Sequence, residues 1–393
     1  MDGLAIPTRL QHYLGPCHGF HLTGDFSLFL NRRRLRCVSR HMQPTRRDFL
    51  AAAGGAALLP RLGAAAQDAR PVVSIVKIRD GNVDYAVEYA IELLGGMRAI
   101  TQGKERILIK PNLVSPNPAA TTKPAVVRTL ARLMKGAHKD VSIGEGSAAA
   151  APFNVKGTEV FRTTRKDLLD GLQQYVFDQL GYTELAKTLR VPLINLHTGE
   201  LVDVKVPGAF VAEKLTIHRA LAETDLLCSA PMMKTHSLAG VTLGMKNLIG
   251  AYPGAVYQAV RGRMHDAASK IEPSGTAVAI VDMVRANRLG LVVVDGSSAM
   301  EGNGPMDGTL VPMETIVAGT NPLATDMVSA ALMGFAADEI PTFAWANKAG
   351  LGPQRLEEVD VRGESIEGAR RKFARAAIYP WEVVRQVWAT REI

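Results

Sequence analysis

The feature that most constrains the fold is an alternation of strand-length apolar runs with helical stretches between residues 71 and 147. The first apolar run is Pro71–Ile78, and an amphipathic stretch from Asp84 to Leu94 follows it. Arg106–Lys110 is apolar again, Pro124–Ala137 is amphipathic, and Val141–Ile143 is a third apolar run. Strands that alternate with helices at this spacing pair in parallel through right-handed crossovers. We therefore predict an α/β fold: a mostly parallel sheet with helices on both faces, in three layers.

The remaining pattern predicts one large α/β domain over residues 67–393. A helical insertion is expected at about residues 148–190, and a small antiparallel β element within residues 201–214. The other expected strands are 191–196, 225–229, 291–295, 315–318 and 359–361. Helices are expected at about 164–180, 182–189, 273–287 and 321–334 and near the C-terminus, and a loop at 296–305.

Residues 42–66 have the pattern of a twin-arginine export signal. Arg46-Arg47-Asp-Phe-Leu precedes a weakly apolar run, Ala51–Leu59, and Ala64-Ala-Ala offers a small-residue cleavage site. The run is too short for a membrane span, which needs about 20 apolar residues. We therefore expect export by the twin-arginine translocase, a periplasmic location and no stable membrane span.

Residues 1–41 are expected to be a disordered extension that does not belong to the working protein, because Met42 stands just before the paired arginines. The first 66 residues carry nine arginines against three acidic residues, so most of the formal charge of +8 belongs to the leader. The rest of the chain is nearly neutral. A nucleic-acid partner is therefore not expected.

Cysteine content limits the cofactors. Beyond the leader the only cysteine is Cys228, in an expected buried strand. Iron–sulfur clusters usually take four cysteines, so no such cluster is expected in this chain. Twin-arginine export carries folded proteins, often after a cofactor has been inserted, which points to a cofactor without identifying it.

Polar side chains follow four expected strand ends, and ligands of open α/β sheets bind in the crevice beyond those ends. Cationic and amide groups suited to hold a small anion, carboxylate or phosphate, are Lys110, Asn112, Lys234, Lys246 and Asn247. Candidate acid/base groups are His236, His265 and Glu145. A divalent first-row metal could be held by His236, His265, Asp295 and Glu301.

Each of these residues also has a purely structural reading. Lysines extend from strand ends, single histidines are often hydrogen-bonded in a core, and acids in glycine-rich loops cap backbone N–H groups. Asp326, in the first turn of an expected helix, is read as a cap and is left out of the site. The chain has no common catalytic or nucleotide-binding motif, which makes an ordinary nucleotide site unexpected.

Five segments together resemble the domain of unknown function 362 family over about residues 72–362. They are Lys110-Pro-Asn-Leu-Val, Glu223-Thr-Asp leading to Pro231-Met-Met-Lys-Thr-His, Gly244-Met-Lys-Asn-Leu-Ile-Gly, Val294-Asp-Gly and Met300-Glu-Gly-Asn-Gly-Pro. Members of that family often carry a twin-arginine leader or a fused ferredoxin-type module with two four-iron clusters. This chain resembles the first kind and lacks the cysteines of the second. The family's activity is not established, so the resemblance supports the site and leaves the reaction open.

Three functions remain open at this point. The first is an exported enzyme that acts on a small anionic substrate, with a metal or another cofactor. The second is a non-catalytic periplasmic protein that binds a small anion. The third is a partner subunit of a separate ferredoxin, its redox partner. A more distant similarity is to the nickel-pincer lactate racemases, which use lysines and histidines at α/β strand ends, although no histidine spacing here proves that arrangement.

Overall fold

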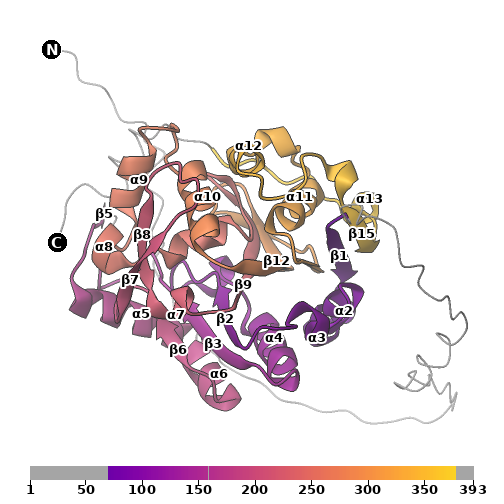
Figure 1. Ribbon diagram of the computed structural model, residues 1–393, viewed down its shortest axis with the longest axis horizontal. Coiled ribbons are helices and arrows are strands. Elements are labelled where there is room, and N and C mark those ends of the chain that lie inside the picture. The colour runs from indigo at the N-terminus through magenta and orange to yellow at the C-terminus, as the bar shows by residue number, and fades with distance from the viewer. Residues whose placement is uncertain (1–69, 158, 378–393) are drawn as a thin grey trace, which may run out of the picture. The chain divides into compact units, whose positions relative to one another are not determined.

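A mixed, mostly parallel sheet forms the centre of the computed structural model, which describes residues 70–157 and 159–377 (Figure 1). The predictions for residues 1–66 lie outside the described residues. The main path of the sheet is β15 (Asp360–Gly363), β1 (Val72–Lys77), β14 (Thr315–Gly319), β12 (Leu289–Glu301), β9 (Leu226–Ala230), β2 (Arg106–Pro111), β3 (Asp140–Glu145) and β6 (Leu193–Asn195). Strand β14 is antiparallel to both of its neighbours, and the other pairs on this path are parallel.

Two apolar cores lie on opposite faces of the sheet because neighbouring residues of a strand point to opposite sides. Ile107 and Ile109 of β2 belong to the core with α2 (Val83–Leu93), α4 (Pro124–Gly136), α5 (Lys166–Gln179) and α6 (Tyr182–Leu189). Leu108 belongs to the core with α10 (Ala277–Ala286), α11 (Pro322–Leu332) and α12 (Pro341–Lys348). The predicted three-layer α/β architecture is confirmed.

Local sequence signals explain where several helices begin. Asn82 and Asn321 are the N-cap residues of α2 and α11, and their side chains accept hydrogen bonds from Tyr85 N and Ala324 N. Proline at the first turn of α4 and α11 suits a position whose N–H has no helical partner. The predicted helix at 273–287 begins later than expected, at Ala277, because Gly275 has a φ of +60°.

The insertion and the small antiparallel element are both present. The insertion holds β4 (Val155–Lys156), β5 (Glu159–Val160), α5 and α6, and β7 (Leu201–Lys205) pairs antiparallel with β8 (Lys214–His218). The other elements are α3 (Met97–Ile100), α7 (Arg219–Ala222), α8 (Gly254–Tyr257), α9 (Gly262–Ala268), α13 (Ile366–Ala369) and four short 3₁₀ turns, η2 (Pro118–Ala120), η3 (Lys246–Ala251), η4 (Ala337–Glu339) and η5 (Leu356–Glu358). Among the described residues, no helix has the length and apolar character needed to cross a bilayer.

One strand was not predicted, and part of the expected loop at 296–305 is a strand. Residues beyond the expected strand end at 229 form strand β10 (Met232–His236), which pairs with β12 and with β11 (Gly240–Thr242). Residues 296–301 continue β12, and its distal end pairs with β13 (Thr309–Val311). The polar residues of these two segments therefore lie on paired strands and not on flexible loops.

Candidate functional site

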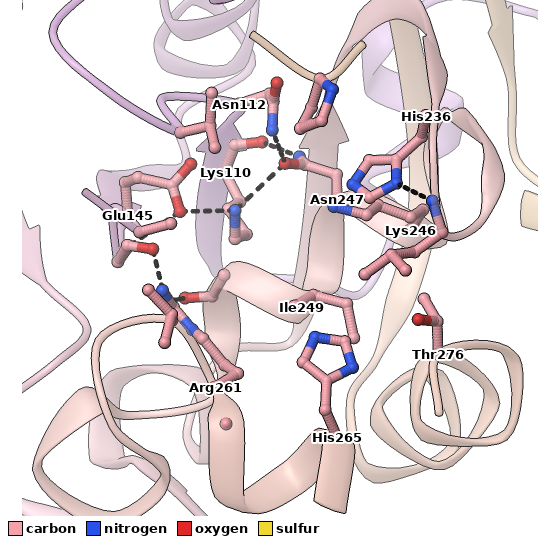
Figure 2. Close-up of a pocket in the computed structure, with 18 of the residues that line it drawn as sticks. Lys110, Asn112, Glu145, His236, Lys246, Asn247, Ile249, Arg261, His265 and Thr276 are labelled. Atoms are coloured by element: carbon pink, nitrogen blue, oxygen red, sulfur yellow. Dashed lines mark hydrogen bonds and ion pairs between the residues drawn. The ribbon is translucent and has the colours of Figure 1, made fainter. Parts of the chain in front are cut away.

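A cavity of about 80 Å³ lies beyond the carboxyl ends of β2, β3 and β10 (Figure 2). A buried water needs roughly 10–15 Å³ by the same measure, so the cavity has room for a ligand of only about half a dozen heavy atoms. The polar lining residues are Lys110, Asn112, Glu145, Arg162, His236, Lys246, Asn247, Arg261, His265 and Thr276.

Most of the residues expected at strand ends line this one cavity. They are Lys110, Asn112, Glu145, His236, Lys246, Asn247 and His265. Lys234, Asp295 and Glu301 do not line it. The arrangement therefore brings the predicted cations, amides and imidazoles together without the two acids expected from β12.

The polar centre of the cavity is a buried ion pair between Lys110 and Glu145. Their side chains are 0% and 3% exposed, and Nζ lies 2.7 Å from Oε1. Lys110 also donates to Pro111 O and Asn247 Oδ1, so all three of its N–H bonds have acceptors. Burial lowers the pKa of Lys110, and the charge of Glu145 partly offsets that effect. Lys110 thus has a structural role, because protein groups already accept all of the hydrogen bonds of its ammonium.

Both carboxylate oxygens of Glu145 also have hydrogen-bond partners within the protein. Its Oε1 accepts from Gly146 N as well as from Lys110, and its Oε2 accepts from Leu113 N at 2.9 Å. Asn247 extends the network, because its amide donates to Lys110 O and to Ser229 Oγ. The carboxylate expected to be a general base therefore fixes the loops after β2 and β3.

Gly250 is required where it approaches this ion pair. A Cβ added there would lie 2.4 Å from Glu145 Oε1 and 2.7 Å from Lys110 Nζ. We expect Gly250→Ala to lower the free energy of unfolding by about 1–3 kcal/mol, measured by chemical denaturation, because an overpacked site must shift. Gly136→Ala is the matched control, since a Cβ at Gly136 meets no atom within 4 Å. An equal effect of the two substitutions would contradict this contact.

Arg261 holds the loops on the other side of the cavity. Its guanidinium donates to Ser147 O at 3.2 Å, to Gly250 O at 3.0 Å, and also to Gly146 O and Ala259 O. Burial lowers its pKa to about 10. Its Nε is buried and has no acceptor among the described residues.

Lys246 differs from these cations because no described residue offers its ammonium a hydrogen bond or ion pair. Burial lowers its pKa to about 7, and the charges of Lys110 and Arg261 contribute to that shift. Asp326 fixes the backbone just before it: Oδ1 and Oδ2 accept from Gly244 N and Met245 N at 2.7 and 2.8 Å. Asp326 is therefore structural, but it does not cap its own helix as expected, because Asn321 is the N-cap of α11 and Asp326 binds the Gly244–Met245 backbone instead.

The two histidines of the cavity differ in which ring nitrogen carries the proton. His236 Nδ1 accepts from Leu238 N and Ala239 N, so the neutral ring carries its proton on Nε2. His265 Nδ1 lies 3.0 Å from Gly275 O and must donate to it, which leaves Nε2 as the ring's acceptor. Burial lowers both pKa values, that of His265 to about 4. At neutral pH Nε2 is therefore protonated in His236 and unprotonated in His265.

The three remaining candidates have structural partners elsewhere. Lys234 is fully buried and donates to Ala120 O and Pro305 O. Asp295 accepts from Lys123 N and from Ser297, and Glu301 accepts from Ala374 N. Lys234 is thus not exposed to a ligand in this cavity, because its strand lies within a paired layer rather than at a free end.

The predicted metal set of His236, His265, Asp295 and Glu301 is not assembled. Across residues 70–157 and 159–377, no three His, Cys, Asp or Glu side chains are placed to hold a metal ion. A metal is bound by the neutral imidazole through its unprotonated nitrogen, and in His236 that nitrogen already accepts two backbone N–H groups. The donors present therefore do not fit a metal centre.

Arg162 and Arg261 line the cavity and were not predicted. Arg162 belongs to the insertion, forms an ion pair with Asp266 at 2.6 Å, and has a buried Nε without a described acceptor. Arg261 has a φ of +58°, which is uncommon for a residue with a side chain. The only sequence signal for either is an arginine near glycine, as in Arg261-Gly-Arg, which is too common to identify a site.

Comparisons with known proteins are consistent with this description. The family model described as domain of unknown function (DUF362) matches residues 107–331. A thylakoid-associated protein from Synechocystis sp. is 25% identical over 280 residues, which cover 70% of this chain and 78% of that protein.

Two solved structures align with part of the chain. The lactate racemase apoprotein from Thermoanaerobacterium thermosaccharolyticum gives a TM-score of 0.41 at 15% identity, over 69% of this chain and 59% of that one. A Thermotoga maritima protein gives 0.33 at 12% identity, over 62% and 56%. The chain thus spans less than two thirds of either solved protein.

Proposed function

The chain belongs to the DUF362 family, and from this premise we propose that it is an exported enzyme acting on a small anionic substrate, a carboxylate or a phosphate. The observation that carries the proposal is the Lys246 ammonium, which lines a small cavity without a described partner. Lys246 is half-buried, and a cation held largely away from water without a counter-ion is unfavourable, so an anionic ligand would supply that counter-ion. The cavity volume limits the ligand to a few heavy atoms.

The histidines supply the rest of the proposed chemistry. His236 Nε2–H would donate a hydrogen bond to a substrate oxygen, and His265 Nε2 would accept a proton from the substrate. Glu145 and Lys110 are positioning residues in this proposal, since they bind each other. The reaction class is thus proton transfer on a small anion, without a metal shell.

Export is part of the proposal and rests on the pattern of residues 42–66. Replacing Arg46 and Arg47 together by lysine is expected to keep the chain in the cytoplasm, as judged by cell fractionation. Periplasmic accumulation of the double variant would count against twin-arginine export.

A second candidate is a non-catalytic binding protein for the same anions. It is favoured by the full occupation of Glu145, because the one carboxylate among the cavity's polar lining residues has no oxygen left for proton transfer. The two functions differ in turnover. An enzyme would exchange substrate C–H hydrogen with deuterium from D₂O, lost in His265→Gln, whereas a binder would not.

Anion binding should depend on pH through Lys246. The anion pairs with the protonated amine, whose pKa in the free protein is about 7. Affinity should therefore be constant well below pH 7 and fall as the proton is lost above it, so that binding is about tenfold weaker at pH 8 than at pH 6. Calorimetric titration with acetate and with inorganic phosphate at both pH values measures this, after correction for the ionisation of phosphate itself.

Two substitutions separate charge from titration. Lys246→Arg keeps a cation that does not titrate in this range, so binding should persist and the acetate pH dependence should vanish. Lys246→Met should abolish the thermal stabilisation that either anion gives. Lys187→Met, at an exposed lysine, is the control and should behave as wild type. Unchanged stabilisation in Lys246→Met would overturn the proposed role.

A further inference from the structure

We propose that the Lys246 amine is a nucleophile that forms an imine with the carbonyl group of a small 2-oxo carboxylate in this cavity. The inference rests on the proposed function, since it uses the same cavity, and names its substrate class. It rests first on position: among Lys110, Lys234 and Lys246, only the partly exposed Lys246 combines a place in the cavity lining with an ammonium that no described residue binds.

The charges around Lys246 favour its neutral form, which is the nucleophilic one. Burial is the largest influence, and neighbouring cations add to it. The pKa of about 7 leaves roughly half of the amine neutral at pH 7. The charged and titratable groups that influence Lys246 or are influenced by it are Lys110, Lys234, Arg261, Glu145, His236 and His265.

The cavity has separate places for the two ends of a 2-oxo carboxylate. Arg261 and Arg162 both line the cavity, and carboxylate oxygens are suitable partners for guanidinium groups. Figure 2 shows Arg261 and Lys246 on different sides of the cavity. A carboxylate near the arginines would therefore place the adjacent carbonyl carbon toward Lys246. Glyoxylate and pyruvate have the size that the cavity volume permits.

The proposed imine formation uses only side chains that line the cavity. The neutral amine attacks the carbonyl carbon, and His236 Nε2–H donates a hydrogen bond to the carbonyl oxygen as it gains negative charge. His265 Nε2 accepts a proton from the attacking nitrogen and passes it on to that oxygen, which gives a carbinolamine. The second amine proton follows to the same oxygen as the C–O bond breaks and the C=N bond forms, so both amine hydrogens leave with the oxygen as one water molecule. No oxidant, reductant or metal is needed.

Borohydride trapping tests the inference. Full-length protein is incubated with pyruvate at pH 7, reduced with sodium borohydride and digested for peptide mass spectrometry. The expected result is a secondary amine on Lys246 in at least tenfold excess over the exposed Lys187. Acetate or inorganic phosphate added first should lower trapping at Lys246 and leave Lys187 unchanged. Protein unfolded before the reaction should lose the preference.

The outcomes separate this inference from the proposed function. Lys246→Arg should still be stabilised thermally by pyruvate and should show no adduct at residue 246. If pyruvate stabilises the wild type but reduction traps no adduct on Lys246, or labels lysines in proportion to exposure, the imine is overturned and anion binding stands. If neither pyruvate nor acetate stabilises the wild type and no adduct forms, both are overturned.

Discussion

Replacing Lys110 by methionine should lower the free energy of unfolding by about 3–5 kcal/mol, because it leaves Glu145 buried without its counter-ion. The carboxylate is 3% exposed and would keep only the N–H groups of Leu113 and Gly146. Methionine fills a similar volume, so the loss would report the missing charge rather than a cavity. Urea denaturation followed by circular dichroism measures the difference.

The double variant Lys110→Met/Glu145→Gln tests that explanation. Glutamine removes the uncompensated charge and retains an oxygen for Leu113 N or Gly146 N, so the double variant should be more stable than Lys110→Met alone. Lys187→Met removes an exposed ion pair with Glu184 and should change stability little. Additive losses from Lys110→Met and Glu145→Gln would show that the pair is not coupled, contrary to its 2.7 Å contact.

The sequence predicts the position of the candidate site well, because strand ends are local features. Apolar runs that stop at Lys110 and before Glu145 place both residues at the same edge of a parallel sheet, and they form an ion pair there. His236, Lys246 and His265 follow the next strand in the sheet, β9, and their side chains reach the same cavity.

The sequence fails where a strand continues past an apparent stop. Asp295-Gly-Ser-Ser reads as a turn, yet β12 runs on to Glu301 and pairs with β10 and β13. Asp295 is therefore held within the sheet rather than at its open edge, and its carboxylate binds Lys123 N. Such continuation depends on pairing partners that are distant in the chain, and local turn chemistry does not reveal it.

Arginines that join distant loops are also invisible in the sequence. Arg261 donates to the carbonyl of Gly146, which is 115 residues away, and Arg162 pairs with Asp266 across 104 residues. Neither contact has a periodic or spacing signature. The sequence also gives no way to rank the three predicted ligand lysines. In the structure, protein groups accept hydrogen bonds from Lys110 and Lys234, whereas no described residue binds the ammonium of Lys246.

Replacing Arg261 by lysine is expected to be nearly as damaging as loss of the ion pair, about 2–5 kcal/mol. The guanidinium reaches the carbonyls of Gly146, Ser147 and Gly250 from two nitrogens. A lysine has the same charge but carries its donors on one nitrogen, so buried carbonyl groups would lose their partners. Urea denaturation measures the loss.

The same substitution should weaken acetate binding even though Lys246 is unchanged. Gly146 and Gly250 both line the cavity, and the Arg261 guanidinium donates hydrogen bonds to both of their carbonyls. Without these hydrogen bonds, the two loops would no longer fix the size of the cavity around Lys246. Arg165→Lys, at an exposed arginine paired with Asp167, is the control. Wild-type acetate affinity in a destabilised Arg261→Lys would show that the arginine supports the fold alone, and that the cavity's form does not depend on it.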